Sequence, residues 1–300
     1  MKKRPIIFTL FSENHVAQAM HKTLGYDMGK ITLHQFPDGE TSVTIDSEVD
    51  GRDIIFIAQL DNPNPKFLPL LFAAETTKAL GGKRVALIAP YLPYMRQDIQ
   101  FHPGEGVTSK YFAKLISHYF DALITIDPHL HRWHALNELY TIPAKTLHAM
   151  DEVSHWIQNN VTNPVLIGPD AESSQWVADI SGKIHVPFLI LEKVRKGDRV
   201  VEIFMSNIGL YKDCTPVLVD DIISTAATMI ETVIHLKALK MKAPVCIGVH
   251  ALFAGNAYTD LINAGADKII TCNTIAHVSN VINLKDVLVK AIVGLYKQEN

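Results

Sequence analysis

Short apolar runs alternate with longer helical patterns along the whole chain. The runs are uninterrupted stretches of Val, Ile and Leu, which are typical of strands buried on both faces in a parallel sheet. Predicted strands begin at Asp53, Arg84, Ala122, Pro164, Phe188, Pro216, Pro244 and Lys268. Amphipathic stretches separate them, as in the segments that start at Ser109 and Ser224. The alternation therefore predicts an α/β fold of doubly wound, mainly parallel sheets.

The length of 300 residues suggests two domains, and the two halves of the chain have a similar alternation of strands and helices. We expect the boundary within "YTIPAKTLHAMDE", so that residues 1–145 form one domain and residues 146–284 form the other. The last helical pattern, in residues 285–300, is expected to pack back on the first domain.

Composition excludes several classes of function. The chain is 48% apolar and 20% charged, as globular proteins are, and its net charge of −3 gives no reason to expect binding to nucleic acid or to a membrane surface. No stretch approaches a transmembrane span, and the apolar run after the basic N-terminus is too short for a signal peptide. Cys214, Cys246 and Cys272 form no C-x-x-C pair, so we expect buried thiols in a reducing cytoplasm.

Polar residues follow several of the predicted strands, where open parallel sheets bind their ligands. Asp127, Asp170, Asp220 and Asp221 each come after an apolar run. The loop of small residues from Ser224 to Thr228 then opens a helix, which leaves backbone N–H groups free to bind a phosphate. Neighbouring carboxylates could accept from sugar hydroxyls, so the pattern favours a sugar-phosphate site. A strand end followed by an N-capping Ser or Thr is the simpler alternative.

The segment "DPHLHRWH" offers three histidines, His129, His131 and His134. A zinc site is conceivable, but neither cysteines nor an H-E-x-x-H spacing supports it. Asp127 and His129 at a strand end suit a magnesium and phosphate site better, because Mg²⁺ prefers few protein ligands together with substrate oxygens. His131 and His134 are then structural or surface residues.

The segment "LEKVRKGDRVVEI" places Lys193, Arg195, Lys196 and Arg199 between two apolar runs. It is either a solvated, charged hairpin or a mobile cationic flap that closes over a polyphosphate and stabilises transferring charge. "FPDGETSV" is by itself an ordinary turn. The chain has no Walker loop, so any ATP is bound in another way.

The ordered set "FPDGE", "PYLPYMRQD", "DPH", "GPD", "EKVRKGDR", "VLVDDIISTAAT" and "HALFAG" resembles the ribose-phosphate pyrophosphokinase family and covers almost the whole chain. Each segment is weak alone, but the ordered set is specific. The segment "HPGEGVTSKYFAKLI" is nearer to archaeal-type members.

The resemblance implies two tandem phosphoribosyltransferase-type domains that transfer the β,γ-pyrophosphoryl group of MgATP to the 1-hydroxyl of ribose 5-phosphate. The implied cofactor is Mg²⁺, the substrates are ATP and ribose 5-phosphate, and the protein is expected to be a cytoplasmic homo-oligomer of two or more subunits. No nucleic acid or membrane partner is expected.

The same resemblance implies a role for each matching residue. Lys193 and Arg195 would be catalytic, and His129 and Asp170 would bind magnesium. The loop around Phe36 would reach the adenine in a neighbouring subunit. The implied ATP contacts are Phe36, Asp38, Gly39, Glu40, Arg96 and Gln97. The implied ribose 5-phosphate contacts are Asp220, Asp221, Ser224, Thr225, Ala226, Ala227 and Thr228.

The chain departs from the family where Ala226 and Ala227 replace two glycines. We expect both to lie at backbone angles that alanine adopts readily, because left-handed angles would be costly for a methyl-bearing residue. Two alternatives remain open: a non-catalytic regulatory paralogue, and a type I phosphoribosyltransferase that consumes the product. The "FPDGE" and "RQD" segments count against the second.

Overall fold

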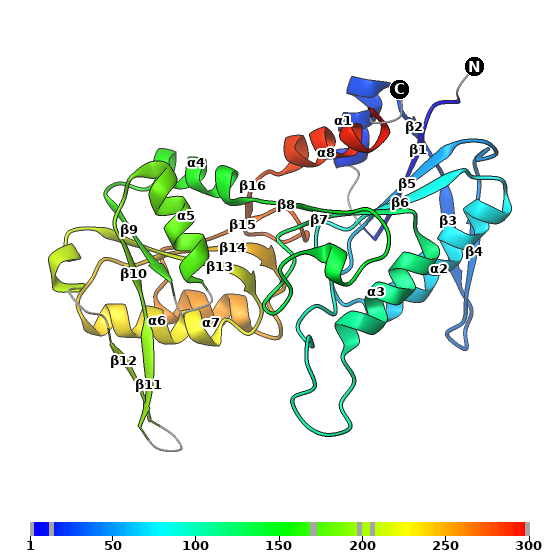
Figure 1. Cartoon of the computed structure of the whole chain (residues 1–300). Coiled ribbons are helices and arrows are strands. Elements are labelled where there is room, and N and C mark those ends of the chain that lie inside the picture. Colours follow the sequence, from blue (N-terminus) through cyan, green and yellow to red (C-terminus); the bar gives the residue numbers. More distant parts are fainter. Residues whose placement is uncertain (1–2, 12–14, 169–172, 197–199, 205–207, 298–300) are drawn as a thin grey trace. The chain divides into compact units, whose positions relative to one another are not determined.

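A computed structural model describes residues 3–11, 15–168, 173–196, 200–204 and 208–297 (Figure 1). The chain divides into two compact units. The first comprises Met1–Leu147 with Lys285–Asn300, and the second comprises His148–Leu284.

The first unit is built on a parallel sheet whose strand order is β2-β1-β5-β6-β7-β8. Helices α1 and α8 pack together on one face, and α2 and α3 lie on the other (Figure 1). Every residue of β5 is buried, as its uninterrupted apolar sequence predicts. The strands are β1 (Ile6–Leu10), β2 (Asp27–Met28), β5 (Asp53–Ala58), β6 (Arg84–Ile88), β7 (Ala122–Ile126) and β8 (Ala144–Leu147). The helices are α1 (His15–Leu24), α2 (Asn64–Ala79), α3 (Thr108–Tyr119), the 3₁₀ turn η1 (Leu136–Glu138) and α8 (Lys285–Lys297).

The second unit repeats this design with the strand order β10-β9-β13-β14-β15-β16, again parallel. Helices α4 and α5 lie on one face of its sheet, and α6 and α7 lie on the other (Figure 1). The predicted α/β class is therefore confirmed. The strands are β9 (Pro164–Gly168), β10 (Phe188–Ile190), β13 (Thr215–Ile223), β14 (Val245–Ala251), β15 (Lys268–Cys272) and β16 (Asn280–Ile282). The helices are α4 (Met150–Asn160), α5 (Ser174–Ile184), the 3₁₀ turn η2 (Ile208–Tyr211), α6 (Ala227–Ala238) and α7 (Ala257–Ala264).

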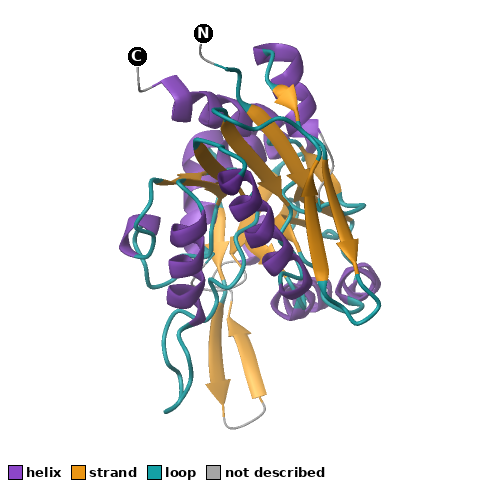
Figure 2. Ribbon diagram, turned by 90° about the vertical axis from the view of Figure 1, so that its right-hand side faces the viewer, coloured by secondary structure: helices purple, strands orange, loops and turns teal. Residues whose placement is uncertain are grey.

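Each unit carries one antiparallel ribbon at the same point of its topology, between its second and third sheet strands. In the first unit the ribbon is β3 (Ile31–Gln35) with β4 (Thr41–Ile45), and in the second it is β11 (Glu192–Lys196) with β12 (Val200–Phe204). Figure 2 shows the second ribbon as an arm of paired strands outside the main sheets. The two units thus share both the sheet order and the site of the insertion.

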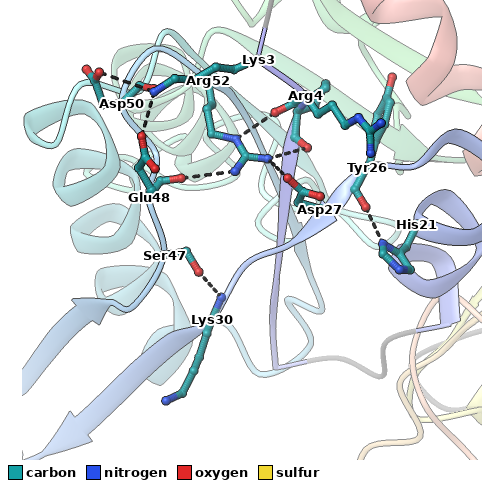
Figure 3. Close-up of polar contacts among 11 residues, drawn as sticks. Lys3, Arg4, His21, Tyr26, Asp27, Lys30, Ser47, Glu48, Asp50 and Arg52 are labelled. Atoms are coloured by element: carbon teal, nitrogen blue, oxygen red, sulfur yellow. Dashed lines mark hydrogen bonds and ion pairs between the residues drawn. The ribbon is translucent and has the colours of Figure 1, made fainter.

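The Arg52 side chain stabilises the base of the first ribbon through hydrogen bonds (Figure 3). Its guanidinium donates to the carbonyl oxygen of Arg4 at 2.8 Å and to the carboxylate of Asp27. A longer contact of 3.4 Å reaches the carbonyl of Glu48, just beyond the ribbon. The planar guanidinium can satisfy several acceptors at once, so this one side chain links the ribbon's exit to the amino ends of β1 and β2.

The cysteines are free thiols, and two of the three environments match expectation. Cys246 and Cys272 are buried, and burial raises the pKa of the Cys246 thiol to about 12. Cys214 is only half-buried, which corrects the prediction that it too lies in the core. Among the described residues, no helix is both long enough and apolar enough to cross a membrane.

Candidate active site

The paired carboxylates lie inside strand β13, which continues beyond them to Ile223 instead of ending with them. Pairing of β13 with β9 stops at Leu218, whereas pairing with β14 extends to Ile223. The strand therefore runs on past the end of one neighbour, because the other neighbour still supplies hydrogen bonds. Asp220 and Asp221 fall on this extension, at the point where the strand order reverses, which is the usual position of a ligand site in such sheets.

Asp220 and Asp221 are both half-buried, and the Asp221 N–H donates to Asp220 Oδ1 at 3.0 Å. Carboxylate oxygens only accept hydrogen bonds when ionised. Two adjacent carboxylates at the mouth of the sheet are therefore suited to hydroxyl groups, such as those of a sugar.

Helix α6 begins at Ala227, and Ala226 occupies its N-cap position without any side-chain capping bond. The expected alternative of an N-capping Ser or Thr is thus wrong. With no capping side chain, the N–H groups of the first helical turn remain suited to an anion, and the helix dipole favours negative charge there.

Ala226 has φ 56° and ψ 11°, which is a left-handed conformation. This contradicts the expectation for Ala226. The chain has only Ser224, Thr225 and Ala226 in which to turn from β13 into α6. Such a tight turn needs a left-handed residue, and glycine adopts that conformation without the steric cost that a Cβ incurs. Ala227 is the first helical residue, a position where alanine is favourable.

Gly248 of β14 allows the end of β13 to pack closely. A Cβ at Gly248 would lie 2.6 Å from Cγ1 of Ile223, closer than packed carbon atoms approach. Gly248 is paired in the sheet with Asp220. No sequence pattern singles out this glycine, because its role depends on a side chain from another strand.

The "FPDGE" segment forms the turn of the β3–β4 ribbon, as its Asp-Gly pair predicts. Phe36 N–H donates to the Glu40 carbonyl at 2.7 Å, and Gly39 has φ 95°, which glycine tolerates. Glu40 N–H lies 3.2 Å from Asp38 Oδ1. The Phe36 ring meets the edge of His34 at 4.7 Å and remains 43% exposed, so an aromatic surface is available at the ribbon tip.

Arg96 and Gln97 lie in the loop after β6. Arg96 is exposed, whereas Gln97 is half-buried with Nε2 3.3 Å from Glu105 Oε2. Glu105 Oε2 also accepts the N–H groups of Phe101 and His102 at 2.9 and 3.1 Å. One carboxylate oxygen therefore closes this loop. Sequence reasoning missed Glu105, which has no motif beyond the glycines on either side of it.

Asp98 next to these residues is 4% exposed, and its Oδ1 lies 3.4 Å from Arg132 Nε. Its Oδ2 lies 3.9 Å from Nδ1 of His131. The loops after β6 and β7 are thus linked by a buried carboxylate.

His129 follows β7 and is half-buried, with its ring 6.2 Å from that of His131 at an interplanar angle of 20°. Asp127 is buried and has φ 34°, and its N–H donates to the Leu147 carbonyl at 2.9 Å. His131 and His134 are exposed, as expected. Within the described ranges there is no cluster of three His, Cys, Asp or Glu residues that could hold a metal. Asp170 lies outside the described residues.

The cationic segment forms the β11–β12 ribbon, in which Lys193 is paired with Ile203 and Arg195 with Val201. This antiparallel backbone is the one that both a charged hairpin and a flap require. Arg199 lies outside the described residues. Phe36 to Glu40, Arg96, Gln97 and His129 belong to the first unit, and the ribbon, the carboxylates and the loop before α6 belong to the second.

Comparisons with known proteins match both units. Residues 5–119 match the N-terminal domain of ribose phosphate pyrophosphokinase, and residues 136–286 match the phosphoribosyl transferase domain. The ribose-phosphate pyrophosphokinase of Sulfolobus acidocaldarius is 32% identical over 279 residues, which cover 91% of this chain and 94% of the relative. The Sulfurisphaera tokodaii ribose-phosphate pyrophosphokinase is 29% identical over 282 residues, with coverage of 91% and 94%. The crystal structure of phosphoribosylpyrophosphate synthetase from Mycobacterium smegmatis has the same fold, with a TM-score of 0.86, 21% identity and coverage of 98% and 99%.

The backbone of the loop before α6 predicts opposite effects for two neighbouring substitutions. Ala226→Gly should raise the free energy of unfolding by up to about 1 kcal/mol, because glycine relieves the left-handed strain. Ala227→Gly should lower it by about 0.5–1 kcal/mol, because glycine is unfavourable within a helix. Urea denaturation of the two variants measures both changes, and a shift of the same sign in both would contradict the geometry.

Proposed function

The chain belongs to the ribose-phosphate pyrophosphokinase family, and on that premise we propose that it is itself a ribose-phosphate diphosphokinase. The proposal rests on the observation that both units match domains of this family. The match includes the first unit, which carries the "FPDGE" turn and the "RQD" loop. A type I phosphoribosyltransferase would need only the sugar-phosphate loop of the second unit, so these ATP segments favour the synthetase.

The second unit supplies the ribose 5-phosphate site in this proposal. Asp220 and Asp221 accept hydrogen bonds from ribose hydroxyls. The loop from Ser224 to Thr228 and the uncapped end of α6 bind the 5-phosphate through backbone N–H groups and hydroxyl donors. The support is the position of these groups at the reversal of strand order in the sheet.

ATP is assigned to residues of the first unit. The exposed Phe36 ring stacks on the adenine, with Asp38, Gly39 and Glu40 forming the turn that presents it. Arg96 and Gln97 supply further contacts to the nucleotide. We assign the adenine beside Phe36 to a neighbouring subunit's site, so the protein acts as a homo-oligomer of at least two subunits. We propose that it acts in the cytoplasm.

Magnesium enters with ATP in this proposal. Mg²⁺ usually keeps several waters and binds one or two protein groups together with substrate phosphates. A site of this kind does not need a cluster of three protein ligands, so the described residues are compatible with it. His129 and Asp170 are the residues we assign to hold the ion, whose charge would neutralise the phosphate oxygens.

The proposed chemistry is a displacement at the β-phosphorus of ATP. The 1-hydroxyl oxygen of ribose 5-phosphate forms a bond to the β-phosphorus and loses its proton, while the bond to the α,β-bridging oxygen breaks and AMP leaves. Negative charge grows on that bridging oxygen. A cation held there stabilises the transition state more than the ground state, and we assign Lys193 and Arg195 to this role.

One observation favours a second candidate, a non-catalytic regulatory paralogue. The left-handed Ala226 is a costly residue at the centre of the proposed phosphate loop. Such a loop would be expected where selection for tight sugar-phosphate binding had been relaxed.

The products of a single assay distinguish these functions. Purified protein with Mg²⁺, ATP and ribose 5-phosphate should form AMP and phosphoribosyl pyrophosphate in equal amounts, because attack at the β-phosphorus releases AMP. Both products can be quantified by ³¹P NMR. ADP with a phosphorylated sugar would identify an ordinary kinase, and ATP binding without turnover would support the regulatory paralogue.

Substitution of Lys193 tests the catalytic assignment. Lys193→Ala should lower kcat by on the order of 10²-fold or more, with little change in ATP affinity, because the cation acts on charge that develops in the transition state. Arg195→Ala should also slow turnover. Lys196→Ala is the matched control in the same strand and should have little effect. A near-normal kcat for Lys193→Ala would leave the ribbon as a charged hairpin.

A further inference from the structure

The loop that precedes α6 is held from one side by the turn after β14. The N–H of Phe253 donates to the Ile223 carbonyl at 2.9 Å, and the N–H of Ala254 donates to the Ser224 carbonyl at 3.0 Å. Leu252 N–H adds a contact of 3.1 Å to the same Ile223 carbonyl. The backbone that enters the proposed phosphate loop therefore takes its position from three consecutive N–H groups.

Phe253, at the centre of this turn, is in an unfavourable conformation. Its φ is 39°, in the left-handed region, although it is a bulky residue and its side chain is buried. Residues in such conformations cost free energy and persist only where the surroundings fix them. The left-handed angle is part of the turn that directs the N–H groups of residues 252–254 toward β13.

Two rings fix Phe253 in this conformation. The His277 ring stacks on it with centroids 4.5 Å apart and planes 30° apart. Tyr258 of α7 meets Phe253 at 5.2 Å and 79°, and meets His277 at 4.9 Å and 73°. These distances and angles are those of favourable aromatic pairs.

His277 is in turn oriented by hydrogen bonds from the end of the sheet. Its Nδ1 accepts the backbone N–H of Ser279 at 3.2 Å and lies 2.7 Å from the Ser279 hydroxyl. That hydroxyl lies 2.8 Å from the hydroxyl of Thr271 in β15, which accepts from Asn280 Nδ2 at 2.9 Å. Because Nδ1 is an acceptor, the proton of the neutral ring is on Nε2. Burial lowers the pKa of the His277 imidazole, which keeps Nδ1 available as an acceptor.

We propose that His277 is a positioning residue for ribose 5-phosphate, acting through its stack on Phe253 and the N–H groups of residues 252–254. This rests on the assignment of the loop Ser224–Thr228 to the 5-phosphate. The chain of contacts runs from β15 and β16 through the His277 ring to the loop, and His277 itself does not touch the substrate in this account.

Two substitutions separate the ring of His277 from its hydrogen bonds. His277→Asn places Oδ1 where Nδ1 was, so it keeps the Ser279 contacts and removes the stacked ring. His277→Phe keeps the ring and removes the acceptor, which leaves the Ser279 N–H unpaired. Val278→Asn is a control at a neighbouring residue that is 82% exposed.

The measurement is the Kd of ribose 5-phosphate by titration calorimetry without ATP, together with the melting temperature of each variant. His277→Asn should weaken ribose 5-phosphate binding by roughly 3- to 10-fold, the size expected from a lost aromatic pair. His277→Phe should lower the melting temperature more than His277→Asn does, yet bind within about twofold of the wild type, because its ring still stacks on Phe253. The Kd for MgATP and both properties of Val278→Asn should stay unchanged.

The inference is overturned if His277→Asn binds ribose 5-phosphate normally, or if affinity falls in proportion to stability across the two variants. It is also overturned if the wild type does not bind ribose 5-phosphate at all. Failure of the proposed reaction is a separate result: a wild type that binds ribose 5-phosphate but forms no AMP would contradict the enzymatic function and leave the positioning role supported.

Discussion

Parallel pairing of the strands determines where the loops of each unit lie. In a parallel sheet all strands point the same way, so the loops that follow them gather at one edge, and a reversal in strand order opens a crevice there. Both units have the same order, with the first strand next to the second on one side and next to the third on the other. In the second unit this brings the ends of β9 and β13 together, and the carboxylates and the loop before α6 follow from that placement.

The equivalent position of the first unit shows how one topology can be used differently. Asn62 has φ 46° just before α2, much as Ala226 is left-handed just before α6. There, however, Asp61 Oδ1 accepts from Gln59 Nε2 and from Lys66 Nζ, both at 2.7 Å. The Asp61 carboxylate repels a phosphate. It also engages the Gln59 amide and the Lys66 ammonium, which are the donors that a phosphate would otherwise use. This loop of the first unit is therefore poorly suited to a phosphate, which is why we propose the sugar-phosphate site in the second unit.

An antiparallel ribbon is the second feature that the two units share. Each unit inserts an antiparallel pair of strands before its third sheet strand, and each ribbon carries a segment assigned to the nucleotide: the Phe36 turn in one and Lys193 in the other. The Arg52 contacts at the root of the first ribbon give it a fixed base (Figure 3). The family match across both units is consistent with a reaction that uses a contribution from each.

The sequence could predict features that depend on local pattern. The buried strand β5, the turn at Gly39 and the charged ribbon were all evident, because apolar continuity, an Asp-Gly pair and a group of cations between two apolar runs are local signals. It could not predict that β13 continues beyond Asp221 to Ile223, because that depends on hydrogen bonds from β14. The conformation of Ala226 was predicted wrongly, since the angle is set by the distance between the strand end and the helix start. His277 carried no motif, and its place depends on Phe253, more than twenty residues away in the sequence.

We propose that ribose 5-phosphate binds at the reversal of strand order in the second unit. Backbone hydrogen exchange with and without ribose 5-phosphate tests it directly, because phosphate bound by N–H groups slows their exchange. Exchange should be slower in residues 224–229 and 253–254 and unchanged in residues 59–66 of the first unit. Protection confined to residues 59–66, or unchanged exchange in residues 224–229 at saturating ribose 5-phosphate, would contradict it.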